Sequence, residues 1–115
     1  MCWPPQIGDL LPRAADAWCE EHKWSGWILA ERGHGLEFER VLHVGLEDAD
    51  VLWRAIAARI LIEPITGLRD LGCHGLNCEV DIQLTIAGHT TRVRTVWNYD
   101  ASAAAPRLVS AYPAL

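Results

Sequence analysis

The feature that most restricts the fold is a run of alternating apolar and polar residues in the second half of the chain. From Glu79 to Ile86 every even-numbered residue is aliphatic and every odd-numbered residue is polar. This alternation predicts a strand with one buried face. The segment 87–90, Ala-Gly-His-Thr, predicts a hairpin turn. The alternation resumes from Thr91 to Tyr99, so the two strands are expected to pair antiparallel.

The second of these strands has two chemically different faces. One face carries Val93, Thr95, Trp97 and Tyr99, and the other carries Arg92, Arg94, Val96 and Asn98. A loop over 100–105 and a third strand over 107–112 are expected to follow. Residues 65–77 contain three glycines and are interpreted as a connection. We therefore expect Arg92, Arg94 and Asn98 to face solvent or a ligand.

The first half of the chain has helical periodicity. Over 47–62 the apolar residues recur at three- and four-residue spacings, acidic residues occupy the first turn, and Pro64 follows. The residues from Pro12 to about Ala30 predict one helix or two short ones. Leu36–Val44 predicts another, with Leu36 and Val41 inward and Phe38 as a further candidate for that face. Helices followed by a strand meander indicate an α+β fold, with N-terminal helices packed on an antiparallel sheet of three to four strands. The expected core joins the long helix to the sheet through Trp53, Ile56, Ile60, Val80, Ile82, Leu84 and Trp97.

The chain of 115 residues fits one domain, with a helical part at about 12–63 and a sheet part at about 78–113. Half of the residues are hydrophobic, which excludes general disorder, but no apolar run is long enough to span a membrane. The start lacks the pattern of a signal peptide, so a cytoplasmic location is expected. Residues 1–63 hold eleven acidic and six basic side chains, and residues 64–115 hold four of each. The net charge of −5 argues against a non-specific nucleic-acid binder but leaves room for a local basic face.

Four cysteines, at positions 2, 19, 73 and 78, allow several disulfide pairings or a metal site. Cys73 and Cys78 flank a histidine, as zinc ligands can, but a second pair at similar spacing is missing. We therefore expect free thiols, no bound metal and no other cofactor.

The C-terminal segment resembles a family of small bacterial domains of unknown function. The matching residues are Val-Arg-Thr-Val-Trp at 93–97 and Pro-Arg-Leu-Val-Ser-Ala at 106–111. Family members occur alone or at the C-terminal ends of polymorphic toxins. More loosely, the segment 23–29 and His34-Gly35 resemble the front half of the family. Basic residues that usually follow the family's His/Gly loop are replaced here by Leu36, Glu37 and Phe38.

The toxin context and the order of elements also resemble the metal-independent RNase fold of barnase-like, colicin-like and RelE-like toxins. RNA cleavage without a metal needs a base, an acid and cations that stabilise the charged phosphorane. The candidate catalytic residues are Lys23, His34, Arg94, Arg107 and Ser110. Lys23, Arg94 and Arg107 also match positions of the family. Each has a structural alternative, and the two arginines could equally form salt bridges across strands.

Three functional interpretations follow. The first is a toxin-like, metal-independent RNase of a bacterial toxin–antitoxin or conflict system, active or decayed, that holds RNA on the sheet face. The second is a non-enzymatic immunity or antitoxin-type protein that binds the product of a neighbouring gene through its acidic helical half. The third is a regulatory module for a small ligand. The sequence slightly favours the first and does not specify an oligomeric state.

Overall fold

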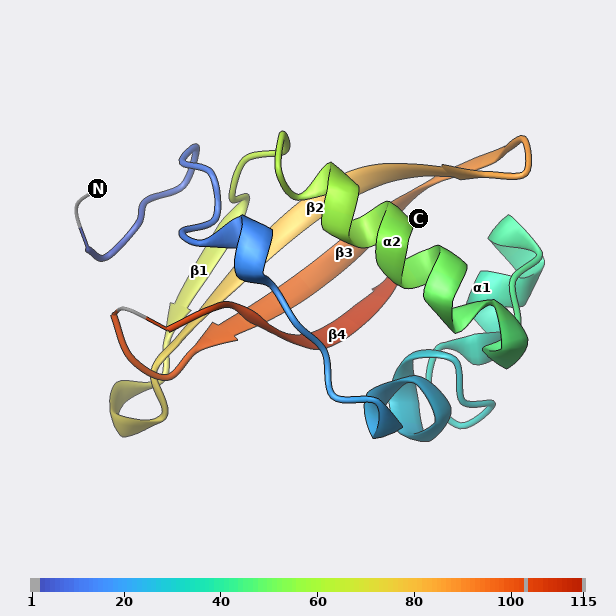
Figure 1. The fold of residues 1–115 in the computed structure, drawn as a ribbon, viewed down its shortest axis with the longest axis horizontal. Coiled ribbons are helices and arrows are strands. Elements are labelled where there is room, and N and C mark those ends of the chain that lie inside the picture. Colours follow the sequence, from blue (N-terminus) through green and yellow to red (C-terminus); the bar gives the residue numbers. More distant parts are fainter. Residues whose placement is uncertain (1–2, 103, 115) are drawn as a thin grey trace.

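The computed structural model describes residues 3–102 and 104–114, and these residues form an α+β fold with a four-stranded antiparallel sheet (Figure 1). Neighbours in the sheet follow chain order, which confirms the predicted meander. The strands are β1 (Gly67–Asp70), β2 (Leu76–Ile86), β3 (His89–Tyr99) and β4 (Arg107–Pro113). The helices come before the strands in the chain, as the order of the sequence patterns predicts.

The β2–β3 hairpin forms the centre of the sheet. Its turn is formed by Ala87 and Gly88, with φ of 50° and 85°, the left-handed geometry that a two-residue hairpin turn needs. The register pairs Leu84 with Thr91 and Val80 with Thr95, so the apolar faces of the two strands coincide. A β-bulge between β3 and β4 lies at Val96/Trp97.

Residues 65–77 are not only a connection. They contain the edge strand β1, which pairs with the first four residues of β2, and a 3₁₀ turn over Gly72–His74. The sequence of β1 lacks apolar alternation, since this strand is formed by pairing with β2 rather than by burial of its own side chains. The strand that was predicted to start at Glu79 therefore starts earlier, at Leu76, because its first residues pair with β1.

Two α-helices form in the first half of the chain, α1 (Gly35–Leu42) and α2 (Ala49–Arg59). Helix α2 crosses one face of the sheet (Figure 1). It is shorter than the predicted 47–62, because Leu46–Asp48 form a 3₁₀ turn and the chain beyond Ile60 leaves the helix. There Ile65 forms backbone hydrogen bonds with Gly8 and Asp9.

The helical prediction for residues 12–30 is largely wrong. This segment contains a 3₁₀ turn over Ala14–Asp16 and a π-helical turn over Trp24–Ile28. Between them, the Trp18 N–H donates to Pro106 O and the Trp18 carbonyl accepts from Leu108 N–H. The backbone of Trp18 thus forms its hydrogen bonds with the edge of β4. In a helix, the same N–H and carbonyl would have bonded to residues of their own segment.

The core lies between α2 and the sheet, as predicted. Ile56, Ile60, Val80, Ile82 and Trp97 are fully buried, and Leu84 is almost so. Trp53 is only partly buried, at the edge of the core between Trp24 and Trp97. Of the residues expected inward on α1, Phe38 is fully buried, Val41 is partly buried and Leu36 is exposed. Leu42, which was not among them, is also buried in the core. No helix in the described residues is long and apolar enough to cross a membrane.

Candidate functional site

His34 is held at the start of α1 by close backbone packing. The glycines on either side, Gly33 and Gly35, lie against the backbone of Trp27 and Leu29, and a Cβ atom at either position would clash there. The His34 N–H donates to the carbonyl of Trp27 at 3.1 Å. The Gly-His-Gly sequence therefore permits a loop folded tightly on the preceding π-helical turn, with the imidazole as the only side chain it projects.

The imidazole of His34 packs between two aromatic rings and next to a carboxylate. Its centroid lies 5.3 Å from the Trp27 ring and 5.0 Å from the Tyr112 ring. His34 Nδ1 lies 3.4 Å from Glu37 Oε1, and the histidine side chain is 21% exposed. When Nδ1 carries the proton and donates to Glu37, Nε2 retains the lone pair that a general base needs.

Tyr112 connects His34 to Arg94. Arg94 and Tyr112 are opposite each other in the β3–β4 register, and Tyr112 lies close enough to the guanidinium to help raise the pKa of Arg94. Arg94 also donates from Nε and Nη2 to the two carboxylate oxygens of Asp81, at 2.8 and 3.1 Å. The Arg94 guanidinium holds the pKa of Asp81 below its ordinary value of 3.8, and Asp81 in turn is the main cause of the raised pKa of Arg94.

Ser110 lies in the same cluster. Its hydroxyl oxygen accepts a hydrogen bond from Trp27 Nε1 at 3.2 Å. Ser110 faces Val96 in the register, on the polar side of the sheet and two residues before Tyr112. The bulge inserts Val109 between Leu108, which is buried, and Ser110. We call the group of Trp27, His34, Glu37, Arg94, Ser110 and Tyr112 the His34 cluster.

Three of the five predicted site residues, His34, Arg94 and Ser110, therefore belong to one cluster, in which Trp27 and Tyr112 lie between them. Glu37 and Tyr112 are members that the sequence analysis missed. The signals for them were present in the sequence: Glu37 is one helical turn after His34, and Tyr112 shares the alternation of Ser110 at the end of the recognisable C-terminal segment. Neither signal predicts membership of the site until a structure shows that the two segments are adjacent.

Lys23 and Arg107 form a separate group near Cys19. Arg107 Nη1 donates to Glu20 Oε1 at 3.3 Å, and Lys23 and Arg107 both lower the pKa of the Cys19 thiol against the larger effect of burial. Arg107 is opposite Asn98 and Arg94 is opposite Tyr112, so the two arginines are about 13 Å apart along β3. The structure does not bring their guanidinium groups to a common point, and each has a carboxylate partner.

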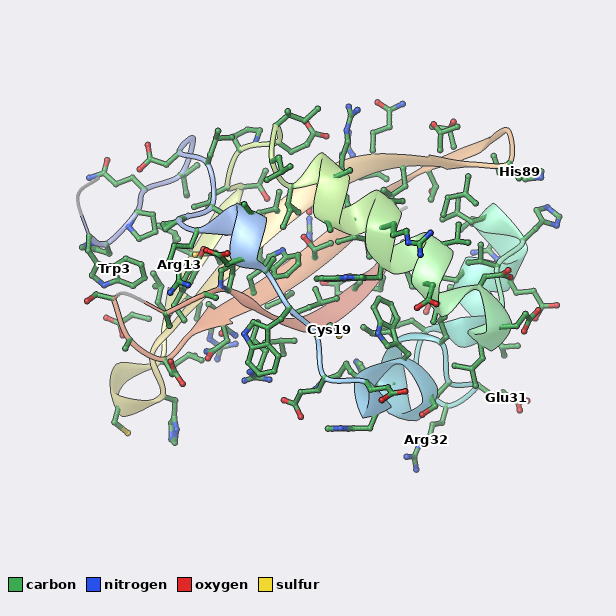
Figure 2. All side chains as sticks on the ribbon, in the orientation of Figure 1. Trp3, Arg13, Cys19, Glu31, Arg32 and His89 are labelled. Carbon is green, nitrogen blue, oxygen red and sulfur yellow. The ribbon has the colours of Figure 1, made fainter. Side chains whose placement is uncertain are left out.

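Three of the four cysteines lie in the described part of the chain, and Cys2 lies outside it. Cys19, Cys73 and Cys78 are all free, and the chain segment of Cys19 passes beside β4 (Figure 2). Burial raises the pKa of Cys19 and of Cys78 to about 11, so both are protonated at neutral pH and are poor nucleophiles. In the described part of the chain, no three His, Cys, Asp or Glu side chains gather to hold a metal ion.

Comparisons with known proteins add no relative. No family model, no curated protein and no solved structure matches this chain.

Proposed function

We propose that the protein is a metal-independent ribonuclease of the toxin type, acting in the bacterial cytoplasm, with the His34 cluster as its catalytic site. The observation that carries the proposal is the grouping of His34, Arg94 and Ser110 in one cluster around Trp27 and Tyr112. They are separated by 60 and by 16 residues in the chain, and Trp27 and Tyr112 join them on the polar side of the sheet. A base next to a guanidinium and hydroxyl groups is the set that phosphodiester cleavage without a metal requires.

In the proposed reaction, Nε2 of His34 accepts the proton of the ribose 2′-hydroxyl while Glu37 orients the ring. The 2′-oxygen attacks phosphorus, and the bond to the 5′-oxygen breaks, which leaves a 2′,3′-cyclic phosphate. The Tyr112 hydroxyl gives its proton to the departing oxygen, and the proton on His34 restores it through solvent. Arg94, held by Asp81, and the Ser110 hydroxyl donate hydrogen bonds to the phosphorane oxygens. Lys23 and Arg107 are outside this reacting group and remain candidates for contacts with RNA further along.

The test is cleavage of single-stranded RNA by the purified protein in EDTA, compared with growth of cells that express it. His34→Gln should lower the cleavage rate by about 10²–10⁴-fold, the usual contribution of a general base. The matched control is His89→Gln, at the exposed tip of the β2–β3 hairpin (Figure 2), which should leave the rate unchanged. Melting temperatures show whether each variant is folded. A wild-type protein without cleavage activity, or a folded His34→Gln variant with full activity, contradicts the proposal.

A second candidate is the immunity or antitoxin-type binding protein. Two observations favour it: Arg94 and Arg107 are each neutralised by a carboxylate, and Trp18 and Trp27 are 46% and 44% exposed beside β4. Exposed tryptophans are frequent anchors of protein interfaces, and the acidic first half of the chain would complement a basic nuclease.

Expression in cells separates the two candidates. Growth arrest that a neighbouring gene relieves supports the ribonuclease. Protection of cells from a neighbouring toxin, lost in Trp27→Ala and kept in His34→Gln, supports the binding protein.

A further inference from the structure

A polar hollow of about 670 Å³ lies next to Asp81, the ion-pair partner of Arg94. It is formed by the exposed parts of β2 and β3 and by the segment that leads from α2 to β1. Its lining includes Glu63, Thr66, Asp81, Gln83, Thr90 and Arg92. Asp81 is also the partner of Arg94, so this ion pair links the lining of the hollow to the His34 cluster.

Each acidic side chain that lines the hollow has an arginine partner outside the hollow. Glu63 pairs with Arg59 at 3.3 Å and also accepts the backbone N–H of Gln83. Asp81 pairs with Arg94. Among the described residues, none provides an ion-pair partner for Arg92, which is exposed. Arg92 helps to lower the pKa of Asp81 from a distance, but its guanidinium forms no ion pair in the described part of the chain and is open to a further anion.

The position of Arg92 relative to Arg94 fits a polymer with repeated negative charges. The two residues alternate on the same face of β3, so their Cα atoms are about 7 Å apart. This separation is comparable with that of neighbouring phosphates in an extended single strand. The Gln83 side chain, on the adjacent strand opposite Arg92, adds an exposed amide that can bond to phosphate or ribose.

We propose that this hollow binds the phosphodiester next to the one that is cleaved, with Arg92 as its principal contact. The inference rests on the proposed ribonuclease function, because it identifies the substrate as a single strand longer than a dinucleotide. The strand runs from the His34 cluster over the Asp81–Arg94 pair to Arg92. Arg92 is a binding residue and takes no part in the chemical step.

The first experiment measures binding separately from cleavage. The probe is a single-stranded 2′-O-methyl oligonucleotide, which lacks the attacking hydroxyl, and fluorescence anisotropy is recorded over a range of salt concentrations. Arg92→Ala should weaken binding roughly tenfold, as expected for loss of a hydrogen-bonded charge contact. It should also reduce the slope of log K against log salt by about 0.7, the value for one phosphate of a single strand. The control is Arg54→Ala, an exposed arginine of α2 on the other side of the sheet.

The second experiment uses RNA that can be cleaved. Arg92→Ala should raise KM for a longer RNA with kcat unchanged, and it should leave a dinucleotide substrate unaffected, since a dinucleotide has only the phosphodiester that is cleaved. Binding that depends on Arg92 in a protein without cleavage activity supports the hollow and contradicts the ribonuclease. Cleavage with unchanged binding and KM in Arg92→Ala supports the ribonuclease and overturns the hollow. A wild-type protein that does not bind the probe also overturns it.

Discussion

The two faces of the β2–β3 hairpin are made by the same backbone, but they differ in burial and in the interactions that hold their side chains. On the face under α2, Val80, Ile82 and Val93 are fully buried, and the side chains pack without a polar atom left unpaired. On the opposite face, Asp81, Gln83 and Arg94 are partly or largely open to solvent and are held mainly by charge and hydrogen bonds. Each residue on one face is the direct chain neighbour of a residue on the other.

This contrast shows how stability and candidate function are divided in a small sheet. The buried face contributes through removal of apolar area from water, which tolerates little change. The polar face contributes less to the free energy of unfolding, so it can present a histidine cluster and an exposed arginine with little loss of stability. Substitutions at adjacent positions should therefore have very different effects on the free energy of unfolding.

The largest effect is expected for Ile82→Ala compared with Gln83→Ala. Ile82 is fully buried, so its truncation should lower the free energy of unfolding by about 2–5 kcal/mol. Gln83 is exposed, and its truncation should change stability by less than about 0.5 kcal/mol. Urea denaturation of both variants measures the difference. Similar losses at the two positions would show that the polar face is covered or packed in solution.

A smaller effect is expected for a hydroxyl on the buried face. Thr95 donates to the carbonyl of Val80 and accepts from Trp97 Nε1, both at 2.8 Å. Thr95→Val keeps the shape but leaves the indole N–H without its partner, which should cost about 1–3 kcal/mol. The control is Thr90→Val, which removes only an exposed hydrogen bond to Thr85. Equal stability of the two variants would mean that the buried network contributes nothing.

The smallest effect is expected for the ion pair on the polar face. Asp81→Asn should lower stability at neutral pH by less than about 1 kcal/mol, because solvent screens a pair whose arginine is 39% exposed. The pKa of Asp81 is lower in the folded than in the unfolded state. The contribution of the pair is therefore present above pH 3.8 and is lost as the pH falls through the folded pKa.

The measurement compares urea midpoints of wild type and Asp81→Asn between pH 7 and pH 2.5. The two curves should converge in acid, whereas Asp100→Asn, at an exposed position, should follow the wild type throughout. A difference between wild type and Asp81→Asn that is independent of pH would mean that it does not arise from the charge of Asp81.

Local sequence determined the hairpin, its register and its buried face. An alternation with period two can place only one set of side chains in the core, and the turn at 87–88 fixes which residues pair. The helix α2 was predictable for the same reason, since its apolar residues repeat with the period of a helix. The structure of each of these elements could be predicted from about a dozen neighbouring residues.

Tertiary structure decided the rest. Residues 12–30 have helical composition, but their backbone bonds to β4 at Trp18 instead. Strand β1 exists only because β2 offers an edge to it. The His34 cluster combines a loop, a π-helical turn and two strands. Arg107 lies outside it because its partner on β3, Asn98, is four residues along the strand from Arg94. Contacts between distant segments depend on how packed elements meet in space, which no periodicity in the sequence encodes.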